Sequence, residues 1–213
     1  MKNKLCMLLL VSGIGLFSCA EQDLPKEYTD SVNVFIGTGG HGHTFPGATL
    51  PHGMVQLSPD TRLFGWDACS GYYYDDTSIM GFTHTHLSGT GIGDYGDILF
   101  MPVVGEKPLI AGTAENPDEG YRSRFSHEQE SARPGYYQVL LQDDSINVEL
   151  TATLRAGLHR YTYPKASDAR LIVDMEPTIH GHQHPVTQIR VVNDSTICLL
   201  YTSDAADERS SVD

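Results

Sequence analysis

The second half of the chain alternates between hydrophobic and polar residues in short runs separated by turn-forming residues. The runs lie at residues 120–126, 135–141, 146–154, 157–163, 170–174, 187–192 and 196–200. An alternation with a period of two places one set of side chains on each face of a strand. Strands that recur every 8 to 12 residues or so, with turns between them, are typical of antiparallel sandwiches and barrels. We therefore predict an all-β domain built as an antiparallel β-sandwich.

The first half of the chain has shorter apolar runs and two long glycine-rich segments. We expect strands at residues 31–36, 54–57 and 98–101, and loops at residues 37–47 and 81–97. The second loop is too rich in glycine for a helix and too polar for a core strand. Glycine lets a backbone approach a ligand closely, and loops held between strands often carry function. We expect the loop at 81–97 and the polar, aromatic run at 60–74 to form one side of a site.

The N-terminus has the pattern of an export signal. Lys2 and Lys4 precede an apolar run from Leu5 to Phe17, and Leu16-Phe-Ser-Cys19 follows the pattern of a bacterial lipoprotein signal. Residues 1–18 would then be removed, and Cys19 would carry the lipid. An ordinary secretory signal cut after Ala20 is the alternative. Both predict export, to the periplasm or to the outer membrane and cell surface, with residues 19–27 as a polar tether.

Charge and cysteine content limit the partners. With 27 acidic against 14 basic residues the net charge is -13, which disfavours binding to nucleic acid. No segment after the signal has the roughly 20 apolar residues that span a bilayer, so membrane contact is expected only through the lipid. Once Cys6 and Cys19 are accounted for, Cys69 and Cys198 remain. A disulfide between them is permitted but not indicated, and we expect Cys69 to be a buried or site-lining thiol.

Histidines recur in His-x-His pairs at His41/His43, His84/His86 and His180/His182/His184. On a strand, residues two apart face the same side, so two pairs could ligate one metal and form a zinc hydrolase site. Two of the pairs lie in loops, however, and no Glu or Asp has the spacing of a hydrolytic zinc motif. The alternative is that these rings are neutral and hydrogen-bond backbone groups or carbohydrate hydroxyls.

The run from Asp60 to Tyr74 has the composition of a sugar-binding site. Aromatic rings such as Trp66 stack on the apolar faces of sugars, while Arg62 and Asp67 can hydrogen-bond adjacent hydroxyls. An exposed loop with a packed tryptophan is the alternative. Asp94 and Asp97 could serve as an acid and base, but their closeness in one loop favours turn capping.

Four segments of the sequence together carry a resemblance to a known family: residues 34–47, 51–60, 69–72 and 81–91. In this order they resemble the N-terminal domain of glycoside hydrolase family 92, the calcium-dependent exo-acting α-mannosidases. The resemblance covers roughly residues 28 to 198. It implies a β-sandwich followed by a larger (α/α)₆ barrel, and hydrolysis of terminal α-mannosides with inversion by a carboxylic acid and a carboxylate base acting through water.

The resemblance also implies where the functional groups lie. The family's catalytic carboxylates and calcium ligands lie mostly in the helical domain, so we expect no catalytic residue and no metal site in this chain. Loops of the N-terminal domain contribute to the sugar pocket. That role falls on Arg62, Trp66, Asp67, Cys69, His84, Thr85 and His86, together with His43 and Phe45.

The C-terminal residues do not continue the pattern. Residues 202–213 have no hydrophobic period, and the chain departs from the family's pattern from Leu199 onward. We expect an incomplete sandwich at residues 28–200 and a non-native or disordered tail at 201–213. The predicted function is to complete the substrate pocket of an exported α-mannosidase acting on mannose-containing glycans, with the helical catalytic domain as partner in cis. A stand-alone carbohydrate-binding module is the alternative, ahead of the zinc hydrolase.

Overall fold

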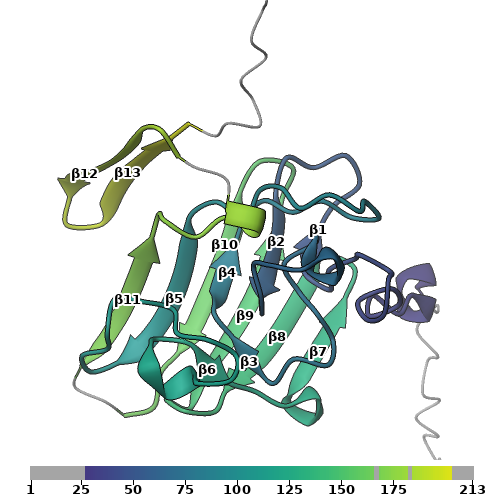
Figure 1. Cartoon of the computed structure of the whole chain (residues 1–213), viewed down its shortest axis with the longest axis horizontal. Coiled ribbons are helices and arrows are strands. Elements are labelled where there is room, and N and C mark those ends of the chain that lie inside the picture. The colour runs from purple at the N-terminus through teal and green to yellow at the C-terminus, as the bar shows by residue number, and fades with distance from the viewer. Residues whose placement is uncertain (1–26, 166–167, 182–183, 203–213) are drawn as a thin grey trace, which may run out of the picture.

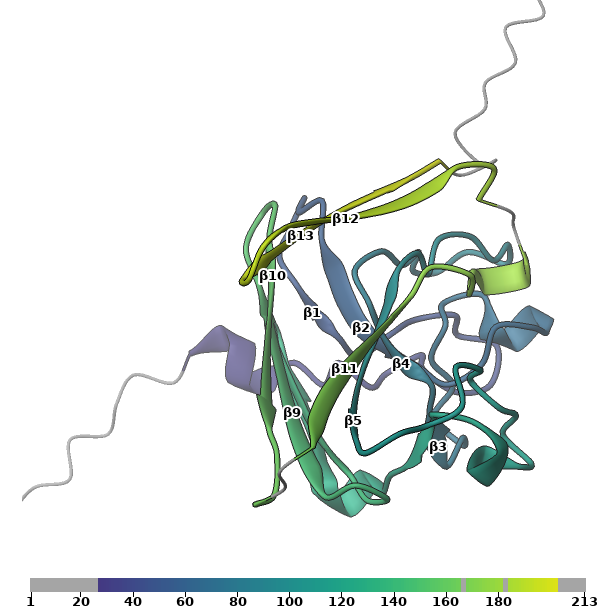
Figure 2. The same cartoon turned by 90° about the vertical axis from the view of Figure 1, so that its left-hand side faces the viewer.

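Two antiparallel sheets packed face to face make up the computed structural model, which describes residues 27–165, 168–181 and 184–202 (Figures 1 and 2). One sheet has the order β1 (Ala48–Thr49), β2 (Gln56–Asp60), β4 (Gly81–Thr83), β5 (Leu99–Val104) and β11 (Ala169–Asp174). The other has the order β10 (Gly157–Thr162), β9 (Ile146–Ala152), β8 (Tyr136–Leu141) and β7 (Glu130–Arg133). The predicted antiparallel all-β sandwich is confirmed.

Smaller elements complete the described part of the chain. A two-stranded ribbon pairs β3 (Ser78–Ile79) with β6 (Ser123–Arg124), and a hairpin pairs β12 (Thr187–Asn193) with β13 (Thr196–Tyr201). The helical turns are the short 3₁₀ segments η1 (Tyr28–Ser31), η2 (Trp66–Ala68), η3 (Pro117–Glu119), η4 (His127–Gln129) and η5 (Ile179–Gly181). Among the described residues there is no helix with the length and apolar character needed to cross a membrane.

Alternating side chains build the core between the two sheets. Every second residue is buried in β8 and, as far as Leu150, in β9, and Val139 lies directly opposite Val148. The facing sheet contributes Leu57, Phe82 and Met101. Each such side chain contributes on the order of 1.5–3 kcal/mol when fully buried, so this alternation decides which face of each strand turns inward.

Three predictions about the first half of the chain need correction. Residues 31–36, predicted as a strand, form turns, in which Asn33 Oδ1 accepts a hydrogen bond from Phe35 N and Phe35 O accepts one from Thr38 N. β2 continues to Asp60 instead of ending at residue 57, and Ser58 to Asp60 are buried. Gly81–Thr83, predicted as loop, form the central strand β4, where a side chain at Gly81 would overlap Leu99. Polar residues thus lie in core strands where they can hydrogen-bond neighbouring groups, and glycine lies there where a neighbouring side chain leaves no room for a Cβ.

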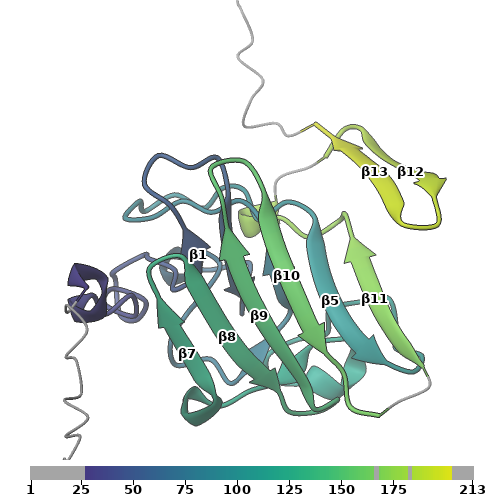
Figure 3. The same ribbon diagram turned by 180° about the vertical axis from the view of Figure 1, so that it is seen from behind.

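The β12–β13 hairpin projects from one end of the sandwich (Figures 1 and 3). All seven residues of β12 are exposed, and Thr202 N donates to Val186 O across its base at 3.0 Å. Strand β13 includes Tyr201, so ordered pairing extends into the predicted tail. The predicted signal, its lipidation site Cys19, most of the tether and residues 203–213 lie outside the described residues.

Candidate functional site

The short turn η2 presents Trp66 and Asp67 on the surface. Gly65, at φ 103°, precedes it, and Trp66 remains 54% exposed. The Cys69 thiol lies beneath, fully buried, and donates to the carbonyl of Trp66 at 2.7 Å. Burial raises the pKa of Cys69, so the group is a thiol and not a thiolate. Cys69 is a free, buried thiol as predicted, and Cys198 is also free.

Two histidines from the loop at 37–47 converge on Asp67. His41 Nδ1 lies 2.6 Å from Asp67 Oδ1, and His43 Nε2 lies 3.7 Å from the same oxygen. Their rings pack against Trp66 with centroids 4.9 and 4.4 Å away. The hydrogen bond from His41 lowers the pKa of Asp67, so this carboxylate is ionised at neutral pH. His43 is buried and has a φ of 52°, an uncommon conformation for a residue with a side chain.

Glycines in the loop at 81–97 allow other segments to approach closely. A Cβ at Gly91 would lie 2.9 Å from Trp66 Nε1, and one at Gly96 would lie 2.8 Å from Ile179 Cγ1. A Cβ at Gly93 would overlap the ring of His180. The glycine content of this loop therefore reflects its packing against η2 and η5.

The turn η5 places His180 next to η2. His180 N donates to Leu63 O at 2.7 Å, while its Nε2 lies 3.1 Å from Gly65 O and 4.0 Å from Cys69 Sγ. The residue has a φ of 65°. Sequence reasoning singled out His41 and His180 only as members of His-x-His pairs and did not place them in the sugar site. Their position beside Trp66 depends on how four distant segments fold together.

Arg62 makes its side-chain contacts with Asp76 and Tyr73. Its guanidinium forms a two-point ion pair with Asp76, which raises the pKa of Arg62, and it stacks over Tyr73 at 4.3 Å. Arg62 also lines a separate cavity of about 470 Å³ with Met80 and the buried Arg122. None of these contacts of Arg62 involves Trp66.

His84 lies between the two sheets. Its Nε2 is 3.1 Å from Nε2 of His159 on β10, and Tyr161 Oη lies 2.7 Å from His159 Nδ1. Burial lowers the pKa of His84 to about 4, with a further contribution from His86, and it lowers the pKa of His159 to about 3, with a further contribution from His84. Both rings are neutral at pH 7. They join β10 to the end of β4.

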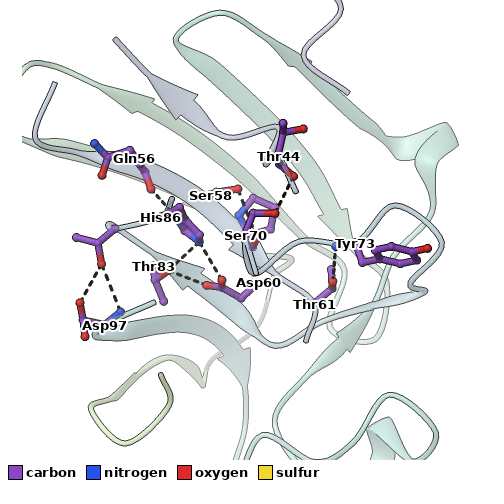
Figure 4. Close-up of polar contacts among 12 residues, drawn as sticks. Thr44, Gln56, Ser58, Asp60, Thr61, Ser70, Tyr73, Thr83, His86 and Asp97 are labelled. Carbon is purple, nitrogen blue, oxygen red and sulfur yellow. Dashed lines mark hydrogen bonds and ion pairs between the residues drawn. The ribbon is translucent and has the colours of Figure 1, made fainter. Parts of the chain in front are cut away.

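His86 is buried against strand β2 (Figure 4). Its Nδ1 lies 2.6 Å from Gln56 O, and its Nε2 lies 2.9 Å from Asp60 Oδ1. Burial opposes charge on this ring, but the Asp60 carboxylate and the Gln56 carbonyl outweigh it and raise the pKa of His86. Phe45 packs on its ring with centroids 5.1 Å apart. In this structure, His86 and Phe45 support the loop from inside.

Thr85 and Asp97 join the two ends of the loop. Thr85 Oγ1 donates to Asp97 Oδ2 at 3.1 Å, and Asp97 Oδ1 lies 2.7 Å from Nε2 of His184 (Figure 4 shows Asp97). Asp94 accepts a hydrogen bond from Tyr95 N at 2.8 Å, which is the turn-capping role expected from the sequence. Asp97 does more, because it also fixes His184.

The described residues show no side-chain arrangement suited to holding a metal ion. Across residues 27–165, 168–181 and 184–202, no group of three or more His, Cys, Asp or Glu side chains is arranged to hold an ion. Of the histidines predicted as possible zinc ligands, His182 lies outside the described residues, and the others contact carboxylates, backbone carbonyls, other rings or each other. The described residues also provide no cluster of carboxylates suited to calcium.

The surface around Trp66 can bind a small polar ligand with an apolar face. Trp66 offers a ring, Asp67 an ionised carboxylate, and His41 an exposed imidazole. Phe64, 67% exposed, extends the apolar surface from the same loop. This combination suits a sugar, which has apolar faces edged by hydroxyl groups.

Residues 31–208 match the glycosyl hydrolase family 92 N-terminal domain. The family GH92 α-mannosidase BT3965 of Bacteroides thetaiotaomicron, solved with mannoimidazole, is 49% identical and superposes with a TM-score of 0.77 over 79% of this chain. The inverting mannosidase BT2199 of the same organism is 32% identical with a TM-score of 0.56 over 70% of this chain. An uncharacterized secreted glycosidase of Arthroderma benhamiae (strain ATCC MYA-4681 / CBS 112371) is 32% identical over 142 residues, or 62% of this chain.

These relatives are much longer than this chain. The chain spans 22% of BT3965, 20% of BT2199 and 17% of the Arthroderma protein. The match to the family includes residues 199–208, beyond the point where the sequence was expected to depart from it.

Proposed function

The chain belongs to the glycosyl hydrolase family 92 N-terminal domain family, and we propose that it completes the substrate pocket of an exo-α-mannosidase that hydrolyses terminal α-mannosides with inversion. Its relatives are glycoside hydrolases, and two of them are named as mannosidases. The observation that carries the proposal is the convergence of His41, His43 and Asp67 around the exposed ring of Trp66.

Within this proposal, the role of the chain is binding. Inversion needs two carboxyl groups about 6.5–9.5 Å apart, one as acid and one as base for water. Asp67 is the carboxylate that the described residues place beside Trp66, and it is already hydrogen-bonded to His41. Asp67 would thus accept hydrogen bonds from sugar hydroxyls, and the acid and base would come from a helical domain in the same polypeptide.

The site residues differ in their proposed roles. Trp66 and Asp67 would contact the sugar, with His43 and Cys69 behind them holding the ring and the turn. Thr85, His86 and Phe45 would position the loop, and His84 would join the sheets. Arg62 would stabilise the neighbouring segment through Asp76.

Calcium and export extend the proposal to the longer protein. Calcium would supply electrostatic stabilisation near the scissile bond, with ligands outside the described residues. Export accords with the description of the Arthroderma relative as secreted, and Cys19 would carry the lipid anchor. Metabolic labelling with a fatty-acid analogue would mark the wild-type protein and not Cys19→Ala if this is correct.

A stand-alone carbohydrate-binding module is the second candidate, since the exposed rings of Trp66 and Phe64 would serve such a module equally well. The enzyme would cleave the bound sugar, whereas the module would only hold it. Extending the reading frame separates the two: several hundred further residues with helical periodicity favour the enzyme, and an in-frame stop favours the module.

Binding of methyl α-mannoside, measured by NMR on the isotope-labelled chain, tests the proposal. We expect shifts at the Trp66 indole and at backbone amides of residues 41–43 and 65–69, and their loss in Trp66→Ala. Tyr28→Ala is the matched control, because it removes a 96% exposed aromatic ring at η1. Absence of any shift at saturating mannoside, or equal shifts in Trp66→Ala, would contradict a sugar site here.

A further inference from the structure

Two buried clusters near the loop at 81–97 repeat the same chemistry. In the first, His86 lies between the carbonyl of Gln56 and the carboxylate of Asp60, and Thr83 Oγ1 donates to the second oxygen of that carboxylate at 2.8 Å (Figure 4). In the second, His184 lies between the carbonyl of Met175 and the carboxylate of Asp97. Thr85 Oγ1 donates there to the second oxygen at 3.1 Å.

Each histidine has a backbone carbonyl at one ring nitrogen and a carboxylate at the other. His184 Nδ1 lies 2.8 Å from Met175 O, and its Nε2 lies 2.7 Å from Asp97 Oδ1. The ring of His184 thus bridges the backbone at Met175 and the side chain of Asp97. The side chains of this pair are each 3% exposed, so water does not compete for these bonds.

The Asp97–His184 pair joins two segments that are distant in sequence. On one side Asp97 ends the loop, whose base is closed by Gly96 N donating to Thr85 O at 3.0 Å. On the other side His184 Nδ1 contacts Met175 O, and Met175 shortly precedes η5 in the chain. Ile179 N also donates to Tyr95 O at 2.9 Å, so the two segments run against each other beside the pair.

The same segment supports the surface around Trp66. His180 of η5 donates from its backbone to Leu63 O, and its ring lies 3.1 Å from the carbonyl of Gly65, the residue that precedes η2. The loop reaches Trp66 from the other direction, where Gly91 packs against the indole. The structure thus places Trp66 between two segments that Asp97 and His184 hold together.

We propose that Asp97 and His184 are positioning residues for the sugar-binding surface, holding η5 and the loop at 81–97 in the arrangement that orients Trp66. This inference rests on the proposed function for the ligand, a terminal α-mannoside. Neither residue lies against the exposed ring, and their effect passes through the backbone contacts of Gly65 and Gly91. From the sequence, turn capping was favoured for Asp97 over an acid–base role, and His184 was noted only as a member of a histidine run.

Trp66 is the sole tryptophan of the chain, so its fluorescence reports this position alone. We expect His184→Ala to change the emission wavelength of Trp66 and increase its quenching by acrylamide, at a temperature well below unfolding. His184→Gln retains a donor near the Nε2 position and should recover part of the wild-type signal. If His184→Ala merely unfolded the protein, His184→Gln would not give a signal between those of His184→Ala and the wild type. Circular dichroism identifies any variant that fails to fold.

Affinity for methyl α-mannoside gives the second measurement. We expect a roughly tenfold weaker Kd in His184→Ala and an intermediate Kd in His184→Gln, as for the loss of one buried hydrogen bond. Asp94→Asn is the matched control, because Asp94 lies in the same loop and bonds only its neighbour Tyr95 in the contacts described above. Asp94→Asn should leave both the fluorescence and the Kd unchanged.

The outcomes separate this inference from the proposed function. If folded His184→Ala and Asp97→Asn show wild-type fluorescence and quenching, the positioning role is wrong whatever the affinity. If the fluorescence changes as expected but the wild-type chain binds no mannoside, the positioning of Trp66 stands and the ligand assignment fails. If His184→Ala unfolds, wild-type fluorescence in folded His184→Gln and Asp97→Asn would still overturn the inference.

Discussion

At Gly93 the loop at 81–97 packs so closely on the ring of His180 that a Cβ there would overlap the ring. Gly93→Ala would force this ring away from Gly65, because the added methyl group overlaps it. We expect a stability loss of about 1–3 kcal/mol, as for overpacked sites, and weaker binding of methyl α-mannoside. Gly39→Ala is the control, since its Cβ would meet Tyr74 at an ordinary 3.5 Å. Equal denaturation midpoints for the two variants would show that the contact does not matter.

Asp60 and His86 form a fully buried ion pair, with both side chains at 0% exposure. Removing one charge from such a pair leaves the other unpaired, which typically costs 3–5 kcal/mol or so. We expect Asp60→Asn to lower stability by an amount near the bottom of that range, because the amide retains one acceptor. Urea denaturation measures it. Asp118→Asn, which breaks the exposed pair with Arg124, should leave the midpoint unchanged; a comparable shift in both would contradict the argument.

Individual residues differ in how well their roles could be read from the sequence. Trp66, Asp67 and Cys69 lie in one short turn, so composition alone indicated a site there. The role of His86 could not be foreseen, because it depends on Asp60 lying inside a core strand. His41 and His180 come from segments 139 residues apart (180 − 41) whose meeting is decided by tertiary packing.

The histidines between β4 and β10 give the sandwich a predictable response to acid. The pKa of His84 is about 4 and that of His159 about 3, both below the usual 6.5. As pH falls below 6.5, the unfolded chain binds protons before the folded chain does, so stability decreases toward pH 4 and 3. Above pH 6.5 both states are neutral at these rings, and the contribution is constant.

Denaturation midpoints at pH 7, 5.5 and 4.5 measure this response. We expect His159→Phe, which keeps an aromatic ring but cannot take up a proton, to lose less stability over this interval than the wild type. Ion pairs elsewhere, such as Arg62 with Asp76, are present in both proteins. Protonation of carboxylates therefore lowers the stability of the wild type and of the variant alike. Identical slopes for wild type and variant would show that His159 does not contribute.

The strands differ in how well periodicity predicted them. β8, β9, β10, β11, β12 and β13 all lie within one or two residues of the predicted runs. β1, β3 and β4 have two or three residues each, too few to show a period. The predicted strand at 31–36 had the right alternation, but the side chain of Asn33 bonds the backbone locally and stabilises a turn instead.

On the scale of the whole molecule, the chain should bind mannosides without hydrolysing them. The pair of carboxyl groups needed for inversion is not assembled around Trp66 among the described residues. We expect no release of mannose from an α-mannoside by purified protein comprising residues 20–213, measured by a coupled assay for free mannose. A longer protein that contains the helical domain is the positive control. Detectable turnover by the short protein that is absent in Trp66→Ala would contradict the assignment of catalysis to another domain.

The projecting hairpin also determines how this protein behaves in concentrated solution. Ile189, Val191, Val192 and Ile197 are 45–74% exposed, and among the described strands none pairs with the outer edges of β12 and β13. Apolar side chains next to unpaired backbone groups favour strand-to-strand aggregation. Sedimentation should therefore show self-association that rises with protein concentration. Val191→Lys, which adds a charge to the most exposed of these positions, should improve solubility without altering the sugar-binding surface.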